Sequence, residues 1–264
     1  MNHVFEKIFN RLRKDIVRGI SKRKLSKNSK GDITKYFDKY AEKKIISGLM
    51  KYFKKRAYII SEEISKPVLI NKKYKNDPYY IIIDPVDGSE NYLNDIPFVC
   101  MGISVFDSKF EPVYAFAGNY YNGHCYYADE RQVRYNGRPA GKETFEKKYL
   151  IMTFSEKKLI SGRGFKNFMK KFKGIRSMGA TIGEIMLVVN GGASVFVDVR
   201  NRLTLENFAP FFLAEKHGLI KMTDEKGGKI IIKDMSLSRP YNIVVSRGIK
   251  GRSEIIKDLK GINV

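Results

Sequence analysis

Apolar side chains recur with helical spacing near the start of the chain. The first stripe consists of Val4, Phe5, Ile8, Phe9, Leu12, Ile16 and Ile20. The second stripe repeats every four residues and consists of Phe37, Ala41, Ile45, Leu49 and Phe53. Both stripes predict amphipathic helices, and we expect the first to dock on the core rather than to lie on a membrane surface. Between them, residues 21–30 are rich in Ser and Lys and are predicted to form a loop.

Strand-like patterns dominate the middle of the chain. Residues 97–128 form short apolar and aromatic runs with turns at Asp107-Ser108 and Asn122-Gly123, which predicts a meander. The second half alternates, with strands predicted at 149–154, 193–199, 229–232 and 242–246 and helices near 163–172, 179–190, 207–217 and 249–259. This alternation predicts a layered α/β fold. We expect one compact unit over 1–264, with halves of about 1–146 and 147–264.

Composition limits the class of protein. The sequence has no run of about 18 apolar residues, so we expect no membrane span. Its first residues lack the uninterrupted apolar region of a signal peptide. The two cysteines, Cys100 and Cys125, lie in apolar runs and are expected to be buried thiols. A cytoplasmic protein is therefore predicted.

The formal net charge of +22 has no obvious catalytic explanation. Such a charge attracts polyanionic substrates and, when it is concentrated, nucleic acid. Here the lysines are scattered in pairs, such as Lys54-Lys55 and Lys147-Lys148, rather than gathered into one module. We expect them to be solvated surface and do not expect a nucleic-acid partner.

The run from Ile81 to Asn91 carries the clearest chemical signal. Three isoleucines lead into the motif Asp84-Pro85-Val86-Asp87-Gly88-Ser89. Two carboxylates three residues apart on a tight turn, with the Val86 carbonyl between them, offer the oxygen ligands that Mg²⁺ prefers. The N–H groups of Gly88 and Ser89 would open a helix, where a phosphate binds readily. The alternative is a strand that simply ends in an Asx turn.

Further carboxylates lie at predicted strand ends and helix starts. Glu62-Glu63 follow a short apolar strand, and Asp38 and Glu42 lie on the second helix. In the second half, Asp198 ends a strand and Glu206 lies at the start of a helix. Active sites of layered α/β proteins collect at such places.

Several segments together resemble the inositol monophosphatase superfamily of Mg²⁺-dependent phosphatases, in its archaeal-type branch. The segments are Asp32–Glu42, Ile60–Ile64, Asp84–Ser89, Asn136-Gly137 and Ile175–Ala180, the last followed by Gly191-Gly192-Ala193. The resemblance implies a layered α-β-α-β-α sandwich. It also implies a phosphatase that acts on inositol 1-phosphate, fructose 1,6-bisphosphate or both, and that forms a homodimer.

The resemblance also assigns roles to residues. One Mg²⁺ would bind Glu62, Asp84 and the Val86 carbonyl, and a second would bind Asp84, Asp87 and Glu206. Glu62 would also contact a third, weaker ion. The catalytic residues would be Asp38, Glu62 and Ser89, with the Ser89 hydroxyl relaying a proton from the attacking water to Asp38. The amides of Gly88 and Ser89 would hold the phosphate.

Glu206 departs from the family pattern, in which an aspartate opens this helix. The extra methylene moves the carboxylate, and Mg²⁺ demands nearly ideal octahedral geometry. A working ligand, a weakened ligand and lost activity all stay open. Asp32 and Thr34, by contrast, are interpreted as helix N-caps.

Substrate contacts are expected in the second half. By resemblance, Ser177, Gly179 and Ala180 would lie against the substrate, and Asp198 would accept hydrogen bonds from sugar hydroxyls. Arg200 and Arg202 could clamp a second phosphate. The alternatives are a solvated strand end for Asp198 and surface charges for the arginines. Tyr120 and Tyr121 are either core aromatics or flanks of a sugar ring.

The sequence as a whole predicts a Mg²⁺-dependent phosphomonoesterase of small sugar or polyol phosphates. One alternative within the superfamily is a nucleotide-directed phosphatase acting on 3′-phosphoadenosine 5′-phosphate or NADP. An alternative from another class is a catalytically weakened relative that binds RNA or a partner through its basic surface.

Overall fold

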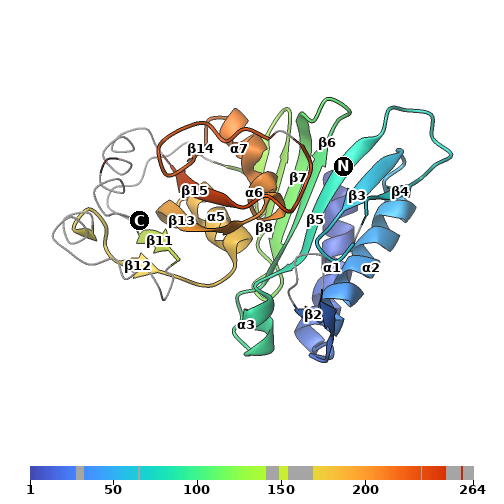
Figure 1. The fold of residues 1–264 in the computed structure, drawn as a ribbon, viewed down its shortest axis with the longest axis horizontal. Coiled ribbons are helices and arrows are strands. Elements are labelled where there is room, and N and C mark those ends of the chain that lie inside the picture. The colour runs from blue at the N-terminus through green and yellow to red at the C-terminus, as the bar shows by residue number, and fades with distance from the viewer. Residues whose placement is uncertain are drawn as a thin grey trace.

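The computed structural model describes residues 1–27, 33–64, 66–140, 149–153, 169–232, 234–247 and 257. Helices and sheets alternate in layers across the molecule (Figure 1). The first half contains helices α1 (Asn2–Arg18), α2 (Tyr36–Tyr52) and α3 (Ser89–Leu93). A small ribbon pairs β1 (Lys24–Lys27) with β2 (Ile33–Lys35).

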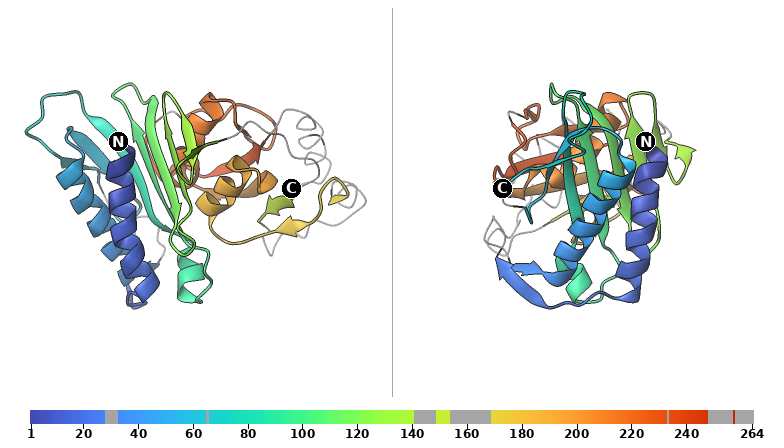
Figure 2. Two further views of the ribbon diagram at one scale, coloured as in Figure 1. Left: turned by 180° about the vertical axis from the view of Figure 1, so that it is seen from behind. Right: turned by 90° about the vertical axis from the view of Figure 1, so that its right-hand side faces the viewer.

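The larger sheet belongs to the first half. Its strands are β3 (Ala57–Ile60), β4 (Val68–Ile70), β5 (Tyr79–Asp87), β6 (Cys100–Phe106), β7 (Pro112–Asn119), β8 (Cys125–Asp129), β9 (Val133–Tyr135) and β10 (Arg138–Pro139). They are ordered β10-β9-β8-β7-β6-β5-β3-β4, so β5 and β6 lie inside the sheet. Helices α1 and α2 cover one face (Figure 2). The apolar stripe of α1 is buried there, which confirms that this helix docks on the core.

The second half forms the smaller sheet. Its strands are β11 (Tyr149–Met152), β12 (Ile175–Arg176), β13 (Ala193–Leu203), β14 (Lys221–Thr223) and β15 (Tyr241–Ser246). They are ordered β12-β11-β13-β15-β14. Between the two sheets lie α5 (Thr181–Val189), α6 (Leu205–Phe208), the 3-10 turn η1 (Ala209–Phe211) and α7 (Phe212–Lys216) (Figure 1).

The predicted α/β sandwich is confirmed. The described residues form four layers in the order helices, large sheet, helices, small sheet. The helices predicted near 163–172 and over 249–259 lie largely outside the described residues. No described helix is both long and apolar enough to cross a membrane.

Three local predictions were wrong. Residues 229–232 form no strand, because the edge of β15 is taken by β14 at Lys221–Thr223. The predicted loop at 21–30 contains β1. This strand forms by pairing with β2, and the sequence of β1 alone does not indicate that partner. The single helix predicted at 207–217 is broken into α6, η1 and α7, since Pro210 cannot continue a helical ladder.

One of the two predicted N-caps is wrong. Thr34 lies in β2, and α2 begins only at Tyr36, with Lys35 as its N-cap. The Lys35 backbone N–H donates to Asp38 Oδ2 at 3.2 Å, so Asp38 satisfies this helix start from within. Asp32 lies outside the described residues. Of the two thiols expected to be buried, Cys100 is fully buried and Cys125 only partly.

Candidate active site

The motif at the end of β5 is buried and bent. Asp84 lies opposite Gly102 of β6, whereas Asp87 lies opposite Cys100, so β5 carries one extra residue between its two carboxylates. Such a bulge re-aims side chains near the end of a strand. The Tyr120 hydroxyl donates to the Pro85 carbonyl at 2.7 Å and fixes the bend from below. Tyr120 is completely buried, so of its two interpretations the core aromatic is correct.

Gly88 makes the turn from strand to helix. Its φ is +89°, and a Cβ there would lie 3.0 Å from the Ala180 Cβ and 3.1 Å from the Phe98 carbonyl oxygen. Only glycine combines this left-handed conformation with such close packing. Ser89 then begins α3, half-buried beside the motif.

Asp38 and Ser89 form the first contact between separate elements. The Ser89 hydroxyl lies 3.0 Å from Asp38 Oδ1 and 3.0 Å from the Val86 carbonyl oxygen, so its single proton has two acceptors. Burial raises the pKa of Asp38 to about 7, and the nearby charge of Glu63 adds to the rise. A carboxyl with this pKa exchanges protons near neutral pH, as a general base does.

A second group of carboxylates lies between α2 and the turn after β3. Glu62 and Glu63 are half-buried in that turn. Burial raises the pKa of Glu42, and the charges of Glu63 and Glu62 raise it further. Among the described atoms, Glu42 Oε2 is buried and has no hydrogen-bond partner. A buried carboxylate whose pKa is raised by the charges of neighbouring carboxylates is a natural place for a cation.

Asp87 connects the two halves of the molecule. Its Oδ1 accepts a hydrogen bond from the Thr181 N–H at 3.0 Å, and its Oδ2 accepts one from the Ile182 N–H at 2.6 Å. Asp87 therefore caps the first turn of α5. Burial raises its pKa to about 8.

The segment expected to face the substrate precedes α5. Ser177 and Gly179 are exposed, and Ala180 is buried as the N-cap residue. Two buried side chains hold this segment in place, Asn91 from α3 and Glu184 from α5. Asn91 Nδ2 donates to the Met178 carbonyl at 2.6 Å, and Glu184 Oε1 accepts the N–H groups of Met178 and Gly179 at 2.5 and 3.2 Å.

Asp198 and Arg200 form an ion pair on β13. Two nitrogens of the Arg200 guanidinium donate to the Asp198 carboxylate, the shortest contact being 2.5 Å. The Asp198 side chain is completely buried, so it is not the solvated strand end of the alternative interpretation. Arg202 is exposed. The two arginines, which the sequence grouped together, thus have different surroundings.

Glu206 and Asn207 are neighbours on α6 but have different contacts. Glu206 is buried, and its Oε1 accepts a hydrogen bond from the Thr204 hydroxyl. Asn207 Nδ2 donates to Asp84 Oδ2 at 3.1 Å. Asn207 therefore links the second half to the β5 motif.

Two cation sites were predicted, and the side chains fit them unequally. Within the described part of the chain, no three His, Cys, Asp or Glu side chains converge to hold a metal ion. The predicted ligands of the first ion suit Mg²⁺ in kind, since all of them are oxygens. Glu42 is not among them, but its buried Oε2, which has no hydrogen-bond partner among the described atoms, adds a further oxygen to the acidic group beside Glu62. The second set is more heavily engaged, because each Asp87 oxygen already accepts a backbone amide hydrogen, and Asp84, which both sets share, accepts one from Asn207.

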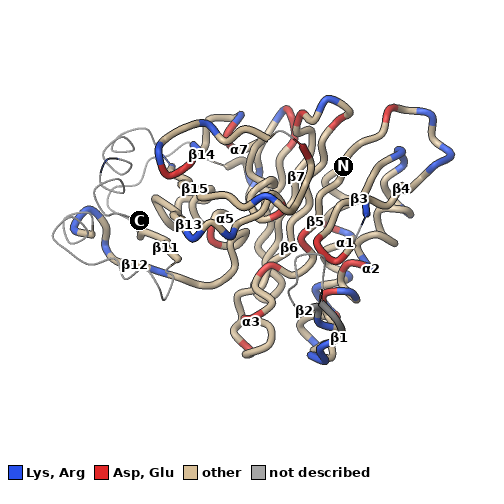
Figure 3. Tube along the Cα trace, viewed as in Figure 1, with Lys and Arg blue, Asp and Glu red and all other residues tan. Residues whose placement is uncertain are grey.

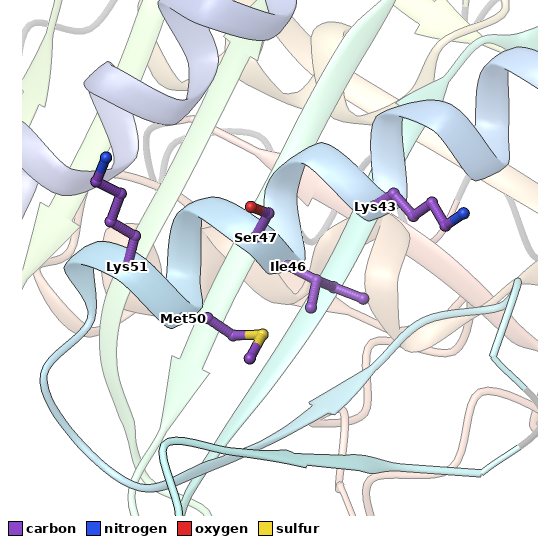
Figure 4. A pocket seen from close by; sticks show the side chains of 5 residues that line it. All are labelled: Lys43, Ile46, Ser47, Met50 and Lys51. Atoms are coloured by element: carbon purple, nitrogen blue, oxygen red, sulfur yellow. The ribbon is translucent and has the colours of Figure 1, made fainter.

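Among the described residues, Lys and Arg are not concentrated at this site. Lys and Arg are spread over both halves of the molecule (Figure 3). An open hollow of about 460 Å³ lies on the outer side of α2, lined by Lys43, Ile46, Ser47, Met50 and Lys51 (Figure 4). No carboxylate lines it, so it is separate from the acidic residues described above.

Sequence reasoning missed four residues that hold the site together: Tyr120 as a support of the Pro85 carbonyl, Asn91, Glu184 and Asn207. A search for carboxylates at strand ends overlooks amides and hydroxyls. Asn207 carried one usable signal, since it directly follows the predicted ligand Glu206.

Comparison with known proteins gives a consistent result. The family model of the inositol monophosphatase family matches residues 3–206. The fructose-1,6-bisphosphatase/inositol-1-monophosphatase of Methanocaldococcus jannaschii is 29% identical over 231 residues, which are 87% of this chain and 85% of the relative. The protein of the same name from Thermococcus kodakarensis is 27% identical over 88% of this chain and 85% of its own.

Solved structures agree. A crystal structure of an inositol monophosphatase–fructose 1,6-bisphosphatase superposes with a TM-score of 0.82 at 26% identity and covers 98% of both chains. A more distant relative is the bifunctional NADP phosphatase/NAD kinase of Methanococcus maripaludis. It is 26% identical over 82% of this chain but only 41% of its own.

Proposed function

The chain belongs to the inositol monophosphatase family, and from this premise we propose that it hydrolyses small sugar and polyol phosphates in a Mg²⁺-dependent reaction. The family consists of metal-dependent phosphatases, so the chain is a hydrolase of phosphoric monoesters. The leading substrates are inositol 1-phosphate and fructose 1,6-bisphosphate, because the archaeal relatives are named for both activities.

The main support for the proposal is the position of the Ser89 hydroxyl, which lies within hydrogen-bond distance of both Asp38 and the Val86 carbonyl. Asp38 accepts the Ser89 proton at Oδ1, and the Ser89 oxygen takes a proton from a water molecule in exchange. The water oxygen can then bond to phosphorus as the bond from phosphorus to the alcohol oxygen breaks. The alcohol oxygen leaves as an alkoxide and takes a proton from a second water molecule, and Asp38 returns its own proton to solvent, which restores the balance.

The ligands of the first predicted ion keep their assignments as proposals. Glu62, Asp84 and the Val86 carbonyl would hold Mg²⁺, which when bound polarises the phosphoryl oxygens and acidifies a water molecule. The amides of Gly88 and Ser89 would hold the phosphate. The alcohol part of the substrate would lie against Ser177, Gly179 and Ala180. Asn91 and Glu184 hold this segment in place.

Arg202 is the better candidate for a second phosphate. It is exposed, whereas the Arg200 guanidinium is committed to Asp198. Arg200 would then act on the substrate side only through the position of Asp198.

The direct test is phosphate release from inositol 1-phosphate and fructose 1,6-bisphosphate in parallel, with Mg²⁺ and with EDTA. We expect turnover that EDTA abolishes. Failure on both substrates, by folded protein in excess Mg²⁺, would overturn the proposal. Light scattering on the same sample tests the predicted homodimer.

NADP is the second candidate substrate, because one relative is named as an NADP phosphatase. A third arm of the same assay therefore measures release of the 2′-phosphate of NADP. We expect it to be slower than release from the sugar phosphates. A preference for NADP would replace the proposed substrate class with nucleotides.

A further inference from the structure

The first turn of α6 places an amide against the β5 motif. Thr204 is the N-cap of α6, and Asn207 is the third residue of the helix. Asn207 Oδ1 accepts a hydrogen bond from the Thr204 N–H at 3.0 Å. Its Nδ2 donates to Asp84 Oδ2 at 3.1 Å. One side chain thus caps its own helix and contacts a carboxylate 123 residues away in sequence.

The two contacts fix which way the amide points. A backbone N–H can only donate, so it requires Oδ1 on its side. A carboxylate accepts, so it requires the NH₂ group on the other side. Turning the amide over would set N–H against NH₂ at the cap and oxygen against oxygen at Asp84, so the network allows one orientation. Asn207 therefore cannot offer an oxygen toward Asp84 while it caps α6.

Glu206 lies elsewhere on the same turn. Successive residues of a helix point about 100° apart, so Glu206 and Asn207 leave α6 in different directions. Glu206 is 2% exposed, and its Oε1 accepts the Thr204 hydroxyl hydrogen. The contact with Asp84 is made from position 207.

We propose that Asn207, not Glu206, is the residue through which the second half reaches the metal-binding carboxylate Asp84, and that its amide lowers the affinity for a second cation there. This proposal rests on the proposed function, which makes Asp84 a ligand. Asn207 gives Asp84 an N–H donor where a shared cation would require an oxygen. The enzyme therefore holds one cation tightly, and the second position is weak.

In Asn207→Asp, the new side chain could both cap α6 and present an oxygen to a cation shared with Asp84. One of its oxygens could accept the Thr204 N–H, which keeps the helix cap, and the other would face Asp84. Two carboxylates at this distance repel unless a cation lies between them. Asn207→Asp should thus be less stable than the natural protein without metal and should regain stability when metal is added.

The test counts bound Mn²⁺, which prefers the same oxygen ligands as Mg²⁺ and loses its electron paramagnetic resonance signal when it binds. We expect Asn207→Asp to bind one more ion than the natural protein within the titrated range, or to bind its weakest ion at least about tenfold more tightly. Tenfold is the lower end of what an outer-shell partner contributes, and a direct ligand should exceed it.

Glu206→Gln is the matched control, because it neutralises the adjacent carboxylate at nearly constant volume. We expect it to bind as many ions as the natural protein. Loss of an ion in Glu206→Gln would overturn the inference, and this holds even if Asn207→Asp fails to fold. An unchanged titration in a folded Asn207→Asp variant, judged by circular dichroism, would overturn it too.

The same preparations separate this inference from the proposed function. If the natural protein releases no phosphate but Asn207→Asp gains an ion as expected, the proposed substrates fail and the role of Asn207 stands. If phosphate is released and the titrations contradict the expectation, the proposed function stands and the inference fails.

Discussion

Two segments bring the candidate active site together, and they differ in how their side chains are fixed. In the first, β5 and α3 form a continuous strand, turn and helix over Tyr79–Leu93, so the side chains of the motif are placed by their immediate neighbours. In the second, β13 and α6 run over Ala193–Phe208, and β13 makes a large bulge. Asp198 lies opposite Ile243 but Leu203 lies opposite Tyr241, so five residues advance while the partner advances two.

The bulge has a consequence for function. The side chains of a contiguous motif are positioned by their immediate neighbours. In a segment from a distant part of the chain, the register of the strand determines which residue reaches the site. In the second segment that residue is Asn207, one position from the predicted Glu206. An offset of one residue on a helix turns a side chain by about 100° and replaces a carboxylate with an amide.

Asp84→Asn tests the first segment most severely. We expect turnover to fall about a thousandfold, because a bound metal contributes several kcal/mol of transition-state stabilisation and each 1.4 kcal/mol is a factor of ten. The fold should persist, since an asparagine oxygen can still accept the Asn207 N–H. Steady-state phosphate release measures the loss. A comparable loss in Glu206→Gln would erase the difference between the two segments.

Arg200→Ala tests the second segment as structure. The change leaves the fully buried Asp198 carboxylate without its partner, and we expect the free energy of unfolding to fall by about 3 kcal/mol. The matched control is the exposed Arg202→Ala, which should change stability by less than about 0.5 kcal/mol. Urea denaturation measures both. If the two variants are equally stable, the Asp198–Arg200 pair does not hold the bulge.

Arg202→Ala has its own kinetic prediction. It should raise the KM for fructose 1,6-bisphosphate more than the KM for inositol 1-phosphate, because only the first substrate carries a second phosphate. Equal changes for the two substrates would remove Arg202 from that role.

Asp38→Asn probes the proton relay of the first half. We expect a loss of about a hundredfold, at the lower end of what a general base contributes. In the natural enzyme kcat/KM should rise with pH up to about 7, because burial gives Asp38 a pKa of about 7 and only its ionised form accepts a proton. That limb should disappear in Asp38→Asn. If kcat/KM of Asp38→Asn still rises with pH up to about 7, a group other than Asp38 is responsible for that rise.

The smallest effect concerns the buried Glu184. Burial raises its pKa from 4.5 to about 7, so between these pH values the folded protein keeps a proton that the unfolded chain has lost. Stability should therefore fall as pH rises from 4.5 to 7 and level off above. Glu184→Gln should flatten this part of the curve of urea midpoint against pH, measured without metal. If the urea midpoint of Glu184→Gln falls with pH as steeply as that of the natural protein, other carboxyls, such as Asp38, cause the pH dependence.

Much of the fold was predictable because periodicity is local. The stripes of α1 and α2 and the runs of β6, β7, β13 and β15 were each identified from their own residues. The errors came from partners. Strand β14 rather than 229–232 took the edge of β15, and β1 formed because β2 lies beside it.

The candidate site divides in the same way. By itself, the sequence determined the Asp84–Ser89 motif, because a strand, a glycine turn and a helix start position those side chains over a few bonds. Tertiary structure alone decided that Asp87 caps α5, that Arg200 is committed to Asp198, and that Asn207 donates to Asp84. These contacts join residues whose relative rotation depends on the register of a bulged strand and on a helix start. Neither is encoded in the spacing of the residues themselves.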